Sequence, residues 1–74
     1  MTINEFIEKF AEQFDETEAS EFTPTTKFKE LDDWSSLTAL SIIAMVDEEC
    51  NVSINSEAIK ESVTIEDLYN KIYA

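Results

Sequence analysis

The sequence predicts an all-α fold: a small four-helix bundle of three longer helices and one short helix, with a long loop between helices one and two. Apolar residues recur at spacings of three and four, which places them on one face of a helix. Residues that cap helices stand at the start of these stretches. The length of 74 residues predicts a single domain over residues 1–74 with a modest core. Antiparallel packing of the helices buries their apolar faces.

The first helix is predicted over residues 3–14. Thr2 and Glu5 have the spacing of a capping box, with the threonine as N-cap. The apolar residues behind it form one stripe: Ile3, Phe6, Ile7, Phe10 and Phe14. This helix has one buried and one solvated face, because its outer face carries charged and amide side chains: Glu5, Glu8, Lys9, Glu12 and Gln13.

A long connection is predicted over residues 15–34. Phe22, Phe28 and Leu31 are the apolar residues that would hold it against a core, and a short helical turn is expected near residues 27–31. A loop of this length inside a compact domain is unusual and is often functional.

The second helix is predicted over residues 36–50, with Ser35 as its N-cap. Its apolar residues lie almost all round: Leu37, Ala39, Leu40, Ile42, Ile43, Ala44, Met45 and Val46. Because a single core face does not need so many, a second apolar strip is expected near water. Asn51 is expected to end the helix in a left-handed conformation, since the chain has no glycine.

Two further helices are predicted in the C-terminal part. Asn55 or Ser56 would cap a short third helix, and Thr64 would open the last one. The last helix has one apolar face: Ile65, Leu68, Tyr69 and Ile72.

The charge is the most selective property of the composition. The chain has 17 acidic residues and 5 lysines, no histidine, and a net charge of −12. Such a surface repels nucleic acids and anionic membranes and attracts proteins with basic patches. A triad or dyad that needs histidine is impossible within this sequence, and no cleft is expected that would raise the pKa of a carboxyl group. We therefore expect no enzyme activity.

No metal site is expected either. Zinc would have to be held by Cys50 and carboxylates. An EF-hand needs alternating acids and a central glycine, and the sequence has neither in that pattern. A calcium-binding helical module and a purely protein-binding acidic bundle are the two classes considered beside the main interpretation.

A monomer in the cytoplasm is expected. No apolar run approaches the roughly 18–20 residues that cross a bilayer. Residues 1–5 contain no basic segment typical of a secretory signal. The single cysteine, Cys50, cannot form an internal disulfide, which fits a reducing compartment.

Four motifs at a particular spacing point to a family. Residues 35–37 read Ser-Ser-Leu at the start of the second helix, and residues 47–49 form an acidic triplet near its end. Residues 52–54 then lead into the short helix, and residues 64–68 open the last one. With the long preceding loop, this arrangement resembles the acyl carrier proteins over essentially the whole chain.

The resemblance implies a covalent cofactor on Ser36. A pantetheinyl transferase would join phosphopantetheine to its hydroxyl through a phosphodiester, and the terminal thiol would hold acyl groups as thioesters. Long acyl chains would fold back between the helices. Fatty acid biosynthesis and lipid metabolism are the implied setting, while aminoacyl, D-alanyl and polyketide cargo remain open.

The resemblance also implies a surface for partner enzymes. Leu37, Leu40 and Ala44 lie on one helical strip, followed by Asp47 and Glu48, and acyl-processing enzymes with basic patches would dock there. The alternatives are that the strip packs under the long loop and that the acids are a solvated helix end.

Ser35 stands where the family usually has an aspartate that helps the transferase to recognise its substrate. The alternative function is therefore a degenerate, unmodified acidic helical module that binds proteins.

Overall fold

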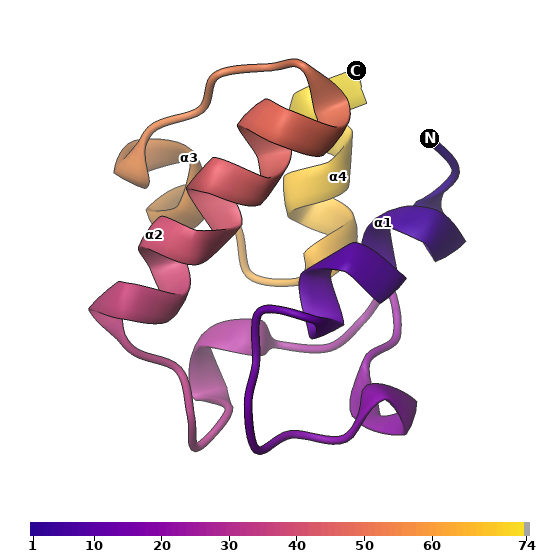
Figure 1. The fold of residues 1–74 in the computed structure, drawn as a ribbon, viewed down its shortest axis with the longest axis vertical. Helices are drawn as coiled ribbons and strands as arrows, with labels where there is room; N and C mark the ends of the chain where they lie inside the picture. The colour runs from indigo at the N-terminus through magenta and orange to yellow at the C-terminus, as the bar shows by residue number, and fades with distance from the viewer. Residues whose placement is uncertain (74) are drawn as a thin grey trace.

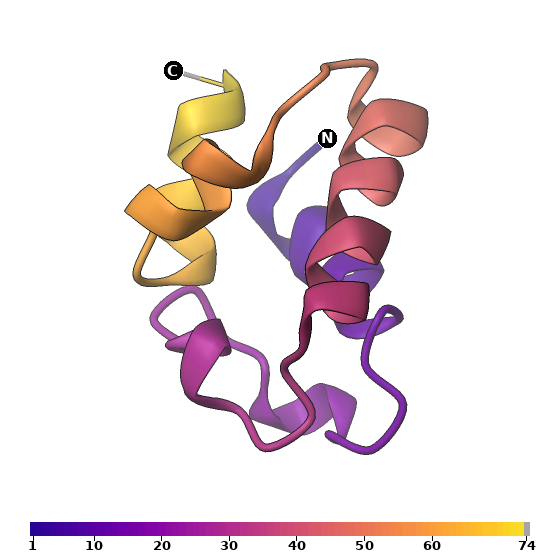
Figure 2. The same ribbon diagram turned by 90° about the vertical axis from the view of Figure 1, so that its left-hand side faces the viewer.

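The computed structural model describes residues 1–73, which form a helical bundle measuring 27 × 23 × 20 Å (Figures 1 and 2). The α-helices are α1 (Ile3–Ala11), α2 (Ser36–Met45), α3 (Ser56–Glu61) and α4 (Ile65–Tyr73). Two 3₁₀ turns, η1 (Ala19–Glu21) and η2 (Phe28–Glu30), lie in the first loop, and a π-helical turn, η3 (Val46–Cys50), follows α2. The predicted fold class is confirmed.

α1 begins with the predicted capping box. The Thr2 hydroxyl oxygen accepts the Glu5 backbone N–H at 3.2 Å, and a Glu5 carboxylate oxygen accepts the Thr2 N–H at 2.9 Å. The predicted end at residue 14 is wrong, because the helix ends at Ala11. The chain then tightens into turns, in which the Phe14 N–H donates to the Ala11 carbonyl at 3.1 Å. This turn brings the Phe14 ring within 5.0 Å of the Phe22 ring, between centroids. The packing of Phe14 against the loop thus ends the helix before the last residue of its apolar stripe.

The loop between α1 and α2 closes one end of the molecule, beside the start of α2 (Figures 1 and 2). Phe22 and Phe28 are buried, as predicted, and η2 lies within the predicted turn. The loop is also joined to α4, since the carbonyls of Thr26 and Pro24 accept the N–H groups of Ile65 and Glu66 at 3.2 and 3.0 Å. Backbone groups that a helix start leaves without partners are satisfied in this way.

α2 ends differently from its prediction. The α-helix stops at Met45 and widens into η3, which covers the acidic triplet. Asn51 then adopts φ 59° and ψ 32°, the left-handed conformation expected there. α3 is capped by Asn55, whose side-chain oxygen accepts the Ala58 N–H at 3.2 Å.

The core is rich in aromatic rings. α1 packs against α2 and α4, and α3 contacts α2 and α4. The Phe10 ring lies 5.1 Å from the Phe28 ring, and the Phe28 ring 5.2 Å from the Trp34 ring. The buried apolar residues are Phe6, Ile7, Phe10, Phe14, Phe22, Phe28, Ile42, Met45, Val46, Ile59, Ile65 and Leu68. Within residues 1–73, no helix combines the length and apolarity required to span a membrane.

Salt is expected to stabilise the bundle. Only two ion pairs join described residues, Lys9–Glu49 at 3.9 Å and Lys71–Glu61 at 3.6 Å, against a net charge of −12. Screening weakens the repulsion among the remaining exposed carboxylates. The melting temperature should rise on adding NaCl, by about 4–8 °C for each kcal/mol of repulsion relieved. Thermal melts from low salt to physiological ionic strength measure this, and a flat or falling melting temperature would contradict it.

Candidate functional site

Ser35 caps α2, as predicted. Its backbone is extended, and its hydroxyl oxygen accepts the Thr38 backbone N–H at 3.3 Å. The Thr38 hydroxyl lies 3.1 Å from the Ser35 hydroxyl and donates to the Asp33 carbonyl at 3.1 Å. Thr38 is 8 % exposed. The Ser35 side chain is therefore engaged in the turn that starts the helix.

Ser36 differs from its neighbour. It is the first residue of α2 and is exposed, and its hydroxyl has no hydrogen-bond partner among residues 1–73. A group joined to this oxygen would stand beside backbone N–H groups of the first helical turn, which favour anions. Of the two adjacent serines, only Ser36 presents a hydroxyl that the fold does not use.

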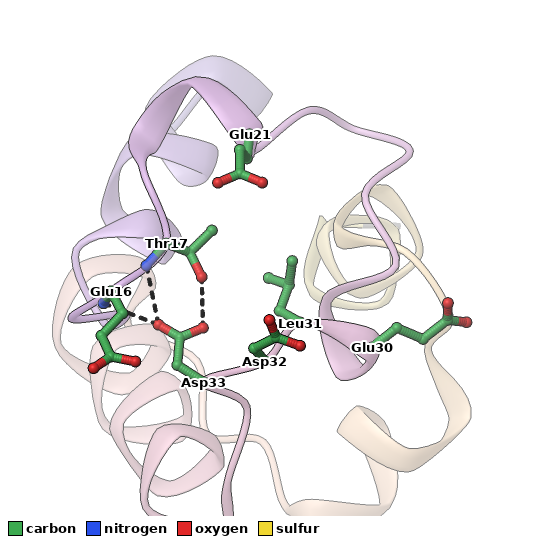
Figure 3. Close-up of a pocket in the computed structure, with 7 residues that line it drawn as sticks. All are labelled: Glu16, Thr17, Glu21, Glu30, Leu31, Asp32 and Asp33. Carbon is green, nitrogen blue, oxygen red and sulfur yellow. Dashed lines mark hydrogen bonds between the residues drawn. The ribbon is translucent and has the colours of Figure 1, made fainter.

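Asp33 holds the loop against the start of α2, a role that the sequence did not indicate. Its carboxylate accepts the backbone N–H groups of Glu16 and Thr17 at 3.0 and 3.1 Å and also the Thr17 hydroxyl (Figure 3). The Thr17 hydroxyl is the main cause that lowers the pKa of Asp33 below its ordinary value. The charge of Asp33 is thus directed toward the loop.

Replacing Asp33 with asparagine is expected to lower the melting temperature at pH 7, because the charge-assisted hydrogen bonds to the loop are lost. A lowered pKa in the folded state means stability that is present above the ordinary value of 3.8 and lost as the pH falls through the folded pKa. The difference between wild type and Asp33→Asn should therefore shrink below pH 3.8. Melts as a function of pH measure it, with Asp32→Asn as the control for losing one charge. Equal effects of the two substitutions on the melting temperature would contradict this role of Asp33.

An apolar pocket of about 360 Å³ opens beside Ser36, between α2 and α3. Its apolar wall consists of Trp34, Ala39, Leu40, Ile43 and Ile59. Its polar lining consists of Lys29, Ser35, Ser36, Ser56 and Lys60. No motif of the sequence marks the residues of this pocket, because η2, α2 and α3 come together only in the fold.

A second hollow, of about 290 Å³, lies on the loop (Figure 3). Its lining residues are Glu16, Thr17, Glu21, Glu30, Leu31, Asp32 and Asp33. Figure 3 shows Glu21 directed toward its centre, whereas Glu30 extends away. Across residues 1–73, no cluster of three or more acidic, cysteine or histidine side chains is arranged to hold a metal ion.

The strip predicted to meet partners is exposed. Leu37 is 76 % and Leu40 61 % exposed, and Ala44, Asp47 and Glu48 are exposed as well. The alternative that Leu37 and Leu40 pack under the long loop is therefore wrong. Two large leucines on the surface of a small helical domain form an apolar patch bordered by acids.

Comparison with known proteins identifies the family. The family model described as phosphopantetheine attachment site matches residues 4–72. No curated protein and no solved structure gives a match. The match covers all four α-helices except Ile3 at the start of α1 and Tyr73 at the end of α4. The chain therefore belongs to the phosphopantetheine-attachment family, whose members are not catalysts themselves but carry substrates on covalently attached phosphopantetheine.

Proposed function

We propose that residues 1–74 form one acyl carrier domain, with phosphopantetheine attached to Ser36 and acyl intermediates held on the arm as thioesters. The observation that carries the proposal is the exposed hydroxyl of Ser36, which has no hydrogen-bond partner among residues 1–73, beside an apolar pocket. Ser35, the only adjacent hydroxyl, is engaged as the helix cap.

The residues around Ser36 fit a phosphodiester and a thioester-bearing arm. The first turn of α2 offers backbone N–H groups and the positive end of the helix dipole to the phosphate. The arm supplies a thiol, which no side chain near Ser36 provides. Tethering the acyl group raises its effective concentration at each partner enzyme.

The proposed cargo is an acyl chain of lipid metabolism, as in fatty acid biosynthesis. The pocket between α2 and α3 favours this choice, because its walls are formed by Trp34, Leu40, Ile43 and Ile59. An aliphatic chain removed from water there is stabilised by about 0.8 kcal/mol for each buried CH₂ group. A charged aminoacyl group would gain much less from such a wall.

The proposed partners are a pantetheinyl transferase and acyl-processing enzymes with basic docking patches, which a monomeric carrier meets in the cytoplasm. Leu37, Leu40 and Ala44 would supply the apolar contact, and Asp47 and Glu48 the charge. A lone cysteine, with no second one in the sequence, is in keeping with a reducing compartment.

Reversing the charge of Glu48 is expected to slow partner association. In Glu48→Lys an exposed acid next to the patch becomes basic and repels a basic partner, and exposed charges act mainly on the association rate. Stopped-flow or surface-binding measurements with a cognate acyl-processing enzyme should show a lower association rate and a weaker salt dependence. Glu57→Lys, on α3, makes the same charge change outside the strip. An equal effect of both substitutions would mean that only net charge matters.

The mass of the intact protein tests the proposed function. The wild-type chain is incubated with coenzyme A and a broad-specificity pantetheinyl transferase, and a gain equal to one phosphopantetheine group is expected. Acyl-coenzyme A donors of different chain length and charge then probe the cargo. A chain that no transferase modifies would favour the alternative, an unmodified acidic helical module that binds proteins.

A further inference from the structure

The pocket beside Ser36 has an unusual charge for this surface. Five hollows are described on residues 1–73, and four of them are lined by at least two carboxylates. The pocket between α2 and α3 is lined by no carboxylate and by two lysines, Lys29 and Lys60. The chain has only 5 lysines against 17 acidic residues. Among these five hollows, two lysines thus line the one that has no carboxylate in its lining.

The fold brings the two lysines together from separate elements. Lys29 belongs to η2 and Lys60 to the last turn of α3, and the Lys29 ammonium donates to the Lys60 backbone carbonyl at 2.8 Å. This bond fixes the Lys29 side chain across the gap between loop and helix. An ammonium group has three donors, so two remain for another acceptor.

We propose that Lys29 and Lys60 are positioning residues that bind the phosphodiester of the arm and turn the arm over the apolar pocket. This inference rests on the proposed attachment at Ser36. The attached phosphate is the anion that must stand at this pocket, because Ser36 itself belongs to the pocket lining.

The charge and the geometry favour this occupant over a separate ligand. The chain as a whole carries a net charge of −12, which repels free anions from solution, whereas a tethered phosphate cannot leave. Binding the phosphate at the pocket directs the rest of the arm along the apolar wall instead of into solvent. The acyl group would then start from a position next to Ile43 and Ile59.

Comparing amide NMR spectra of the unloaded and loaded protein tests the inference, after loading is verified by intact mass. In wild type, loading should shift the amide signals of Ala39, Ile43 and Ile59. In the double variant Lys29→Gln/Lys60→Gln these shifts should be at least twofold smaller. NaCl at about 1 M, where the Debye length is about 3 Å, should reduce them in wild type as well.

Three further variants separate positioning from folding. Lys27→Gln removes an exposed loop lysine that does not line the pocket and should leave the shifts unchanged. Lys60→Gln alone keeps the backbone carbonyl to which Lys29 donates, so it tests the charge with the loop contact intact. The variant Lys29→Arg/Lys60→Gln retains the positive charge at position 29 and should restore the shifts that are reduced in Lys29→Gln/Lys60→Gln.

Two results would overturn the inference: shifts confined to residues 35–38 in wild type, or equal shifts in wild type and the double variant. Either result in a loaded protein removes the lysine role and leaves the carrier function standing. Absence of any mass gain removes the carrier function first.

Discussion

Ser36→Ala is expected to abolish attachment of phosphopantetheine and to leave the bundle folded. The side chain of Ser36 is exposed, and its hydroxyl has no hydrogen-bond partner among residues 1–73, so its loss costs the fold little. Exposed substitutions of this kind change stability by about ±0.5 kcal/mol. Intact mass after incubation with coenzyme A and a transferase should show no gain, while circular dichroism and the melting temperature stay close to wild type.

Ser35→Ala is the matched control for this experiment. The Ser35 hydroxyl oxygen accepts the Thr38 N–H, so its removal should lower stability by about 1 kcal/mol, the usual cost of a lost N-cap. Modification should persist, because the Ser36 hydroxyl is untouched. Modification that survives Ser36→Ala and disappears in Ser35→Ala would reverse the assignment of the two serines.

Local signals predicted most of the fold. The capping box at Thr2, the cap at Ser35 and the left-handed Asn51 each depend on residues within one or two turns, and all three are confirmed. The end of α1 is set instead by the contact of Phe14 with Phe22 and Trp34, which no helical periodicity contains. The widening of the helix into η3 could not be predicted either, because the apolar pattern was interpreted with 3.6 residues per turn.

The site could be predicted only where it is local in sequence. The proposed partner strip consists of close neighbours on α2 and η3, so helical spacing sufficed to group its residues: Leu37, Leu40, Ala44, Asp47 and Glu48. The hydrogen bond from Thr17 to Asp33 spans 16 positions in the sequence, and the hydrogen bond from Lys29 to Lys60 spans 31. Such contacts depend on how the loop folds over the bundle. The apolar pocket also depends on how the loop folds over the bundle, because its lining includes residues of η2, α2 and α3.

A comparison of two leucines distinguishes the partner strip from the core. Leu68 on α4 is 0 % exposed, whereas Leu37 on α2 is 76 % exposed. Leu68→Ala leaves a cavity and should lower the free energy of unfolding by about 2–5 kcal/mol, a large part of the stability of so small a domain. Leu37→Ala removes the same atoms from the surface and should change it by about 0.5 kcal/mol or less.

The rate of acyl transfer to a partner enzyme should separate the two variants in the opposite direction from their stability. Loaded Leu37→Ala protein should remain folded and transfer its acyl group to a partner enzyme less efficiently, because an apolar contact of the partner strip is missing. Urea unfolding measures the stability, and the transfer rate is measured at a temperature where both variants are folded. A loss of several kcal/mol in Leu37→Ala would mean that Leu37 belongs to the core. Unchanged transfer in a stable Leu37→Ala protein would remove Leu37 from the partner strip.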